Sequence, residues 1–335
     1  MKHYIQITLV FAVLLAVIPC IAFLSPGKPD APPESSSSDA ENTVLTDTEK
    51  VKIYFTKEKK LTEYTMQEYM LGAVLAQMPA DFEPAALQAQ AVLARTYALY
   101  RIASESSHPT PALCGAALSD DTKLYHGFFT PEQAKELYKD KYETARQKVL
   151  DAVKSVQDKF LAFEGKPIIV AFHAVSDGFT RSAQDVWGQQ IPYLVSVESK
   201  QDESLKQAKS VTELTSEQLK EKLEKVYDDI NFTDKPQDWL KVTQTGEHGL
   251  VRTVTVCGKE IAASELCEVL DLASQSFVFE VSGGKFIFTC KGLGHLVGMS
   301  QCGANEMAKN GQNCEQILTH YFKGCELRDD LPKSS

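Results

Sequence analysis

Residues 70–100 read MLGAVLAQMPADFEPAALQAQAVLARTYALY, a stretch rich in Ala and Leu. Apolar residues recur at helical spacing on both sides of a proline-containing interruption. Because proline cannot occupy a helix interior, Pro79 and Pro84 bound a tight corner between two helices. The pattern predicts a short helix ending near Gln77 and a second helix carrying Gln88, Gln90, Arg95 and Tyr97. By pattern alone, a buried structural hairpin of small residues is favoured over a functional site.

The composition is that of an ordinary globular protein. The chain has 335 residues, enough for one large domain or two small ones. Hydrophobic residues make up 43% and charged residues 24%. The net charge is −10 and no cluster of Lys and Arg is evident, whereas phosphate binding needs such a cluster. We therefore expect no nucleic-acid partner.

The N-terminal segment has the composition of a membrane anchor. Residues 4–24 are apolar apart from Gln6 and Thr8, which is about the length that a helix needs to cross a bilayer. The run exceeds the core of a normal signal peptide. We expect an uncleaved single-pass anchor over residues 1–24, with the bulk of the chain outside the cytoplasm. A cleaved signal peptide is the alternative.

A tether and an ectodomain are expected to follow this anchor. Residues 25–50 are rich in Pro, Ser and acidic residues and lack apolar periodicity, which is typical of a disordered linker. Residues 51–328 alternate between helical and strand-like patterns. They predict a mixed α+β fold, one compact ectodomain.

The cysteines and histidines show no metal-site spacing. One of the eight cysteines lies in the expected anchor, and the remainder contain no CxxC pair. Cys257, Cys267 and Cys290 are expected to be buried small hydrophobes rather than a disulfide framework. The residues that a zinc site would have to bring together are His108, Cys114, His126 and His173. No recurrent spacing supports such a site, so we predict no metal and no cofactor.

The remaining pattern predicts the order of the elements. These are a strand at 51–55, a polar loop at 104–123, one long helix at 131–158, a β-hairpin formed by 160–163 and 167–172, a helix at 215–229 opened by a Thr215–Gln218 capping pattern, strands at 251–256 and 277–290, and a helix at 263–272.

Two polar loops carry candidate binding residues. FHAVSDGFTRSAQDVWGQQIPYL, residues 172–194, directly follows a strand, and loops held by a rigid scaffold often carry binding chemistry. GLGHLVGMSQCGANEMAKNG, residues 292–311, is glycine-rich and leads into a helix expected from Gly303 onwards. The alternative for residues 172–194 is a surface loop anchored by a packed Trp187. The alternative for residues 292–311 is a strained turn whose polar residues hydrogen-bond its own backbone.

A serine hydrolase is disfavoured by the local context. A triad can be assembled on paper from Ser176, His173 and Asp185, or begun from Ser300 and His295. Neither serine lies in the GxSxG sequence of a nucleophile elbow.

Three long motifs resemble the SpoIID/LytB family of stage II sporulation proteins. They are AQMPADFEPAALQAQAVLARTYAL at 76–99, the loop at 172–194, and GLGHLVGMSQCGANEMAKNGQNCEQILTHYFKGCEL at 292–327. They occur in the order of that family and are spread across most of residues 51–328. The expected anchor and tether also resemble the family's membrane-tethered arrangement.

The resemblance implies a lytic transglycosylase that acts on peptidoglycan glycan strands during sporulation. In that chemistry a carboxylic acid protonates the departing glycosidic oxygen, and the muramic 6-hydroxyl closes on the anomeric carbon to leave a 1,6-anhydro end. One acid/base serves both proton transfers. The resemblance also implies a partner cell-wall amidase and other sporulation membrane proteins.

This chain departs from the family at the catalytic position. The glutamate before Met-Pro is replaced by Gln77, whose amide has no proton to give at neutral pH. Loss of general acid catalysis should cost roughly 10²–10⁴-fold. Either the protein is a glycan-binding relative that no longer cleaves, or another acid such as Glu83 has taken over, or the substitution is deliberate. Milder departures are Asp177, Leu296 and Cys302.

The sequence therefore predicts a glycan groove formed by the three motifs. Its expected residues are Gln77 and Glu83 at the catalytic position, with Arg95, Tyr97, His173, Ser176, Trp187, His295, Ser300 and Gln301 binding substrate. Trp187 would stack on a sugar face.

Overall fold

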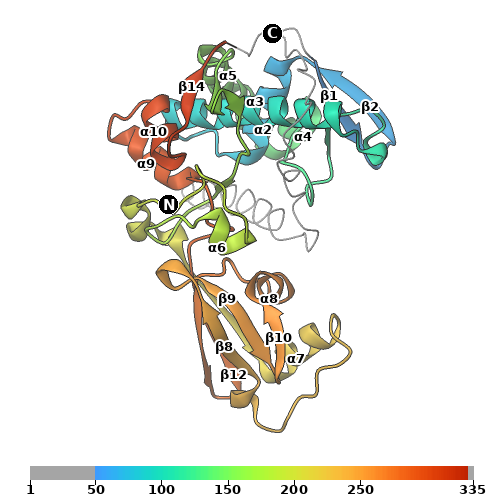
Figure 1. Cartoon of the computed structure of the whole chain (residues 1–335), viewed down its shortest axis with the longest axis vertical. Helices are drawn as coiled ribbons and strands as arrows, with labels where there is room; N and C mark the ends of the chain where they lie inside the picture. Colours follow the sequence, from blue (N-terminus) through green and yellow to red (C-terminus); the bar gives the residue numbers. More distant parts are fainter. Residues whose placement is uncertain (1–49, 331–335) are drawn as a thin grey trace. The chain divides into compact units, whose positions relative to one another are not determined.

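The computed structural model describes residues 50–330, which form a mixed α+β fold (Figure 1). The expected fold class is confirmed. The anchor expected at 1–24 and nearly all of the tether expected at 25–50 lie outside the described residues. Within residues 50–330 no helix is long and apolar enough to cross a membrane.

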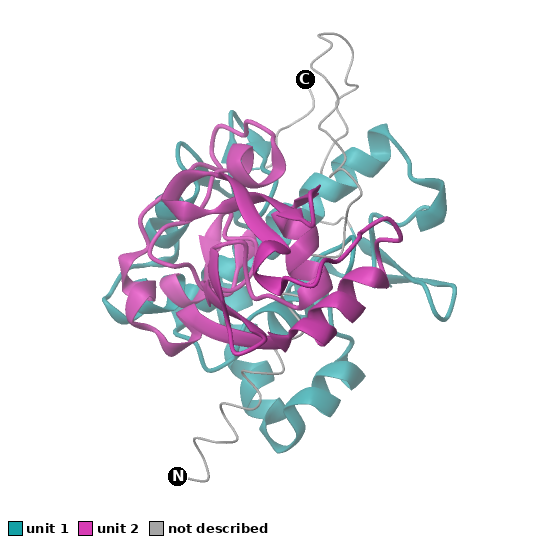
Figure 2. Ribbon diagram, turned by 90° about the horizontal axis from the view of Figure 1, so that it is seen from below, with its two compact units in different colours: residues 1–21, 27–171, 304–335 teal, residues 22–26, 172–303 magenta. Residues whose placement is uncertain are grey.

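The described chain divides into two compact units (Figure 2). The first contains residues 50–171 and 304–330, and the second contains residues 172–303. The expected ectodomain is therefore subdivided, and the second boundary falls inside α9, Gln301–Lys309.

Helices dominate the first unit. Its helices are α2 Met66–Gln77, α3 Pro84–Ser107, α4 Pro131–Tyr138, α5 Tyr142–Ser155 and α10 Cys314–Tyr321. One small sheet has the order β2-β1-β3, with β1 Val51–Phe55, β2 Lys60–Tyr64 and β3 Leu118–Ser119. The other has the order β14-β4-β5, with β4 Phe160–Phe163, β5 Lys166–Pro167 and β14 Glu326–Arg328.

The hairpin of α2 and α3 confirms the prediction from residues 70–100. Thr65 and Glu68 form a capping box that starts α2, and Met78 is extended because Pro79 follows it. Pro84 occupies the first turn of α3, where its missing N–H has no cost. Alanines on α3 at positions 86, 89, 91, 94 and 98 are buried, so neighbouring backbone can approach closely.

The single helix expected at 131–158 is wrong. Lys139 has φ of 51° and ψ of −123°, which ends α4 and separates it from α5 by a short 3-10 turn. No proline or glycine marks this break in the sequence. The loop expected at 104–123 also begins late, because α3 continues to Ser107 and β3 pairs with β1.

The second unit is built from small sheets and short helices. Its strands are β6 Phe172–His173, β7 Lys209–Thr215, β8 Leu240–Thr245, β9 Val251–Val256, β10 Lys259–Ala262, β11 Phe277–Ser282, β12 Lys285–Lys291 and β13 Met299–Ser300. Its helices are α6 Ala183–Trp187, α7 Ser216–Glu224 and α8 Ala263–Leu270. The sheets have the orders β10-β9-β8 and β11-β12-β7, and β6 pairs in parallel with β13.

An aromatic and aliphatic cluster forms the core of this unit. Phe286 and Phe288 of β12, Leu266 of α8 and Val254 of β9 are fully buried in it. The strand expected at 277–290 is wrong as a single element, because Gly283 and Gly284 turn the chain into the β11–β12 hairpin.

Most other predicted elements are confirmed. The hairpin predicted at 160–163 and 167–172 forms only in part. β4 pairs with the two-residue β5 through a turn with Glu164 and Gly165 at positive φ, whereas Phe172 begins β6, which pairs with β13. The Thr215–Gln218 capping box opens α7, which ends at Glu224. Among residues 50–330 all the cysteines are free thiols. Cys267 and Cys290 are buried as expected, whereas Cys257 is only partly buried.

Candidate functional site

The expected groove residues fall in both units, and each group has its own environment. The first unit holds Gln77, Glu83, Arg95 and Tyr97, and the second holds His173, Ser176, Trp187, His295, Ser300 and Gln301.

Gln77 is the last residue of α2 and is only 3% exposed. Its Nε2 donates to the carbonyl oxygen of Gly127 at 2.7 Å. Its Oε1 accepts from Nε2 of Gln90 at 2.7 Å. Because the carbonyl can only accept, the atom that faces it must carry a proton. The position therefore requires a side chain that is both donor and acceptor, which is a neutral amide or a protonated carboxyl.

A short loop supplies the carbonyl and is held against α2. Phe129 N–H donates to Gly72 O at 3.1 Å, and the Phe128 ring stacks on Tyr69 with centroids 5.8 Å apart. A side chain on Gly72 would bring a Cβ within 2.5 Å of the Phe129 oxygen. Gly72 is thus the residue that lets the loop carrying Gly127 reach Gln77.

Tyr97 supports the same loop. Its ring stacks on His126 with centroids 3.9 Å apart, and its hydroxyl oxygen accepts from the His126 N–H at 3.5 Å. Burial raises the pKa of Tyr97 to about 12, so the phenol stays protonated at neutral pH. Tyr97 positions this loop, a role that the sequence did not indicate.

Glu83 and Arg95 occupy different environments on α3. Glu83 lies at the N-cap, half-buried, and its backbone N–H donates to Oδ1 of Asn305 at 2.8 Å. Arg95 is buried within the helix. Glu83 is the acid nearest in sequence to Gln77 that is also partly shielded, since Asp81 is exposed.

In the second unit two histidines and a tryptophan gather. The rings of His173 and His295 meet edge to face at 6.0 Å, and Trp187 lies 5.5 Å from His295. Nδ1 of His173 lies 3.2 Å from the Val297 oxygen, so it carries the proton. Its Nε2 is buried without a hydrogen-bond partner among residues 50–330.

Both imidazoles are neutral at physiological pH. Burial lowers the pKa of His173 to about 3, and the neighbouring His295 and Arg181 act in the same direction. Burial lowers the pKa of His295 to about 4, against the effect of its hydrogen bond to the backbone of Phe172. Neither imidazole can donate a proton as a cation near neutrality. They can serve as neutral hydrogen-bonding groups beside a half-buried Trp187.

The serines belong to a buried carboxylate network rather than a triad. Oγ of Ser176 donates to Oδ2 of Asp202 at 2.7 Å, and Ser199 donates at 3.0 Å. Ser300 also hydrogen-bonds this carboxylate. Burial raises the pKa of Asp202, although these hydrogen bonds oppose the rise. Ser176 Oγ donates to Asp202, and Asp185 pairs with Arg252, so the triad of Ser176, His173 and Asp185 does not form.

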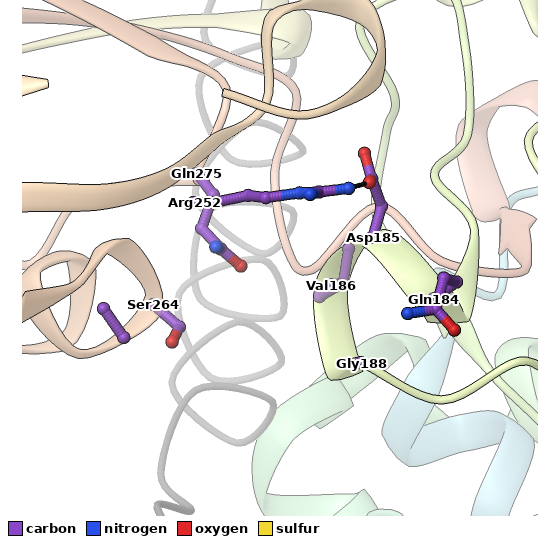
Figure 3. Close-up of a pocket in the computed structure, with 8 residues that line it drawn as sticks. Gln184, Asp185, Val186, Gly188, Arg252, Ser264 and Gln275 are labelled. Carbon is purple, nitrogen blue, oxygen red and sulfur yellow. Dashed lines mark ion pairs between the residues drawn. The ribbon is translucent and has the colours of Figure 1, made fainter. Parts of the chain in front are cut away.

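Asp185 is instead paired with Arg252 across a pocket of about 290 Å³ (Figure 3). Oδ2 of Asp185 also accepts from the Glu247 N–H at 2.6 Å. The pair joins α6, which carries Trp187, to strand β9. It fixes the helix of the Trp187 loop.

Two further expected residues are buried near the start of α9. Gln301 is its first residue and is 2% exposed, and Ser300 Oγ accepts from the Gly303 N–H at 3.1 Å. The helix begins two residues earlier than the expected Gly303.

Leu296 has φ of 65°, a conformation that costs little only for glycine, and it is fully buried. Burial of its side chain offsets this strain.

Sequence reasoning placed Gln90 on the second helix of the hairpin but predicted neither Gln90 nor Gly127 as a site residue. The signal for Gln90 is an amide on the buried, alanine-rich face of α3. The Gly127 contribution is a backbone carbonyl, which no sequence pattern reveals. No group of three His, Cys, Asp or Glu side chains within residues 50–330 could hold a metal ion.

Comparison with known proteins places the chain in a family. A family model described as stage II sporulation protein matches residues 54–163. The chain is 32% identical over 279 residues to stage II sporulation protein D of Bacillus subtilis, covering 83% of this chain and 79% of that protein. It is 30% identical over 342 residues to the Bacillus amyloliquefaciens protein of the same name, covering 98% and 96%. It is 24% identical over 310 residues to a Bacillus subtilis protein named amidase enhancer, covering 76% of this chain and 40% of that protein. The chain belongs to the family of stage II sporulation protein D.

Proposed function

We propose that this chain takes part in peptidoglycan remodelling during sporulation by binding glycan strands and acting with a partner cell-wall amidase, without cleaving the strands itself. Its ectodomain would face the outside of the cytoplasm, held by the N-terminal segment. The single observation that carries the proposal is the environment of Gln77.

The Gln77 amide is hydrogen-bonded at both ends and lacks an ionisable proton. A lytic transglycosylase needs an acid that protonates the glycosidic oxygen and then takes a proton back. The site therefore keeps the shape of an acid site but lacks its chemistry. This supports binding without cleavage.

Glycan recognition is supported by the residues of the second unit. Trp187 is half-buried beside neutral His295, and an aromatic face with a neighbouring polar group suits the mixed apolar and hydroxyl surface of a sugar ring. The amidase partner is suggested by the relative named amidase enhancer.

The decisive experiment compares the full-length chain, in a mild non-ionic detergent, with its Gln77→Glu variant on peptide-free glycan strands. Mass spectrometry scores 1,6-anhydro ends, and co-sedimentation with the same strands scores binding. We expect binding by both proteins and cleavage by the Gln77→Glu variant alone. A parallel assay measures whether the unmodified chain increases stem-peptide release by a purified cell-wall amidase.

Cleavage by the unmodified chain would contradict the proposal and favour a lytic transglycosylase with a different acid. Glu83→Gln is then the variant that should abolish cleavage, because Glu83 is the partly shielded acid nearest in sequence. Failure of both proteins to bind glycan would remove the proposed substrate class.

A further inference from the structure

The sheet β11-β12-β7 of the second unit has one buried and one exposed face. Phe286 and Phe288 point from β12 into the core, so the alternate residues of each strand lie on the opposite face. That outer face includes Val211, which is 61% exposed, and Val278, which is 65% exposed. These are two of the most exposed large hydrophobic residues of the described chain.

The exposed valines form one row across the sheet. Val278 of β11 is in register with Thr289 of β12, and Thr289 is in register with Val211 of β7. The row Val211–Thr289–Val278 is therefore a continuous band of β-branched side chains, which pack well on another pleated surface. We call it the valine row.

Charged rows flank the valine row on both sides. The lysine row, Lys209 beside Lys291, lies two residues from the valine row in one direction along the strands. The glutamate row lies two residues away in the other direction and consists of Glu213, Ile287 and Glu280. Both lysines and both glutamates are exposed.

We propose that this face binds a second copy of the chain, with a two-fold axis running along the valine row in the plane between the two sheets. Such an axis reverses the strand direction and keeps each strand opposite its own copy. The valine row then packs on itself, and the lysine row of each copy faces the glutamate row of the other.

The charge pattern selects this occupant because an isologous interface must be self-complementary. Lys209 lies opposite Glu213 of the second copy, and Lys291 reaches Glu280 one strand away. Glu213 already accepts an ion pair from Lys285 of its own chain at 3.1 Å, so its charge is shared between two lysines.

The face is small for a permanent interface. Two strands of seven residues and one of six present about 300 Å² from strand spacing and rise, whereas a stable dimer buries about 800 Å² per partner. We therefore expect a weak dimer that forms at high local concentration.

Charge reversal tests the pairing with full-length chain in detergent. One variant carries Lys209→Glu with Lys291→Glu, and the other carries Glu213→Lys with Glu280→Lys. Sedimentation velocity over a concentration series should show self-association weakened at least about tenfold in each variant. An equimolar mixture of the two variants should associate again, because their rows are then complementary. Lys57→Glu with Lys60→Glu, on exposed positions of the first unit, is the charge-matched control and should dimerise normally.

Cross-linking gives an independent readout. Thr289 lies on the proposed axis, so a Thr289→Cys variant in a Cys114→Ser background should form a covalent dimer with a short bis-maleimide reagent. Cys114→Ser alone should not. A monomeric unmodified chain at all concentrations, or a mixture of variants that fails to associate, would overturn the proposal. So would an effect of these variants on amidase stimulation with no effect on self-association, because the face would then bind a different protein.

Discussion

The Gln77 site of the first unit and the His173–His295 pair of the second unit are both buried and neutral, but for different reasons. At Gln77 a hydrogen-bond acceptor, the Gly127 carbonyl, requires a proton on the atom that faces it. At the histidine pair, burial lowers the pKa of both imidazoles, to about 3 for His173 and about 4 for His295, so neither is cationic near neutral pH. A single acceptor atom, the Gly127 oxygen, therefore favours an uncharged side chain in the first site, whereas burial of the whole ring favours it in the second. The comparison predicts that the two sites respond differently to substitution and to pH.

The largest effect is expected when an acid replaces Gln77. A Gln77→Glu carboxyl would face the Gly127 oxygen, so its anion is disfavoured and its folded-state pKa should exceed the ordinary value of about 4.3. We expect cleavage activity roughly 10²–10⁴-fold above the unmodified chain, present below that pKa and lost as pH rises through it.

The same variant should show a stability signature with a defined sign. A raised folded pKa means that the folded state holds the proton more tightly than the unfolded state. The protonated carboxyl therefore contributes to the free energy of unfolding below about pH 4.3, and this contribution is lost as pH rises through the folded pKa. Urea unfolding of Gln77→Glu and unmodified chain across pH 4 to 8 measures it. A variant whose stability relative to the parent increases with pH would contradict the assigned hydrogen-bond geometry.

The histidine pair should produce the opposite trend. Its pKa values are lowered to about 3 and about 4, so on acidification the unfolded chain takes up protons near pH 6.5 that the folded chain refuses. Stability is therefore full above about pH 6.5 and falls towards pH 4, by up to about 1.4 kcal/mol per pH unit for each imidazole. His295→Gln should flatten this fall, and His108→Gln, at an exposed position, should leave it unchanged.

A steric test sharpens the role of the loop that carries Gly127. Gly72→Ala places a Cβ within 2.5 Å of the Phe129 oxygen, and we expect destabilisation of about 1–3 kcal/mol. Gly127→Ala is the matched control, because its Cβ would meet only the Ala76 Cβ at 3.7 Å. Urea unfolding of both variants measures the difference, and equal effects would show that the Gly72 contact is not limiting.

The smallest expected effect concerns Gln90. A Gln90→Leu variant removes the donor to Gln77 Oε1, and loss of a buried hydrogen-bond partner costs about 1–3 kcal/mol. Gln88→Leu removes a half-exposed amide that donates to Ser155 and should cost less than about 1 kcal/mol. Equal losses would show that the buried amide pair contributes no more than a surface contact.

Much of the fold follows from local sequence signals. The α2–α3 hairpin, the capping of α7 and the hairpin at Glu164–Gly165 depend on proline, capping side chains and turn geometry within a few residues. The break at Lys139 carries no such signal, because a non-glycine residue takes a positive φ there inside an otherwise helical pattern.

The site divides in the same way. The motif resemblance indicated the position of Gln77 and the neighbourhood of Trp187, and the chain's family is now shown by its relatives. The partners of those residues come from distant positions: Gly127 for Gln77, Asp202 for Ser176 and Arg252 for Asp185.

Local sequence is enough to establish that position 77 holds an amide, that two proline-bounded helices present it, and that the chain has the motifs of its family. The hydrogen-bond partners of that amide, the pairing of charges and the exposed faces depend on how the chain packs. The physical reason is range: propensity, capping and turns act over a few residues, whereas burial and hydrogen-bond partners arise when distant segments pack together.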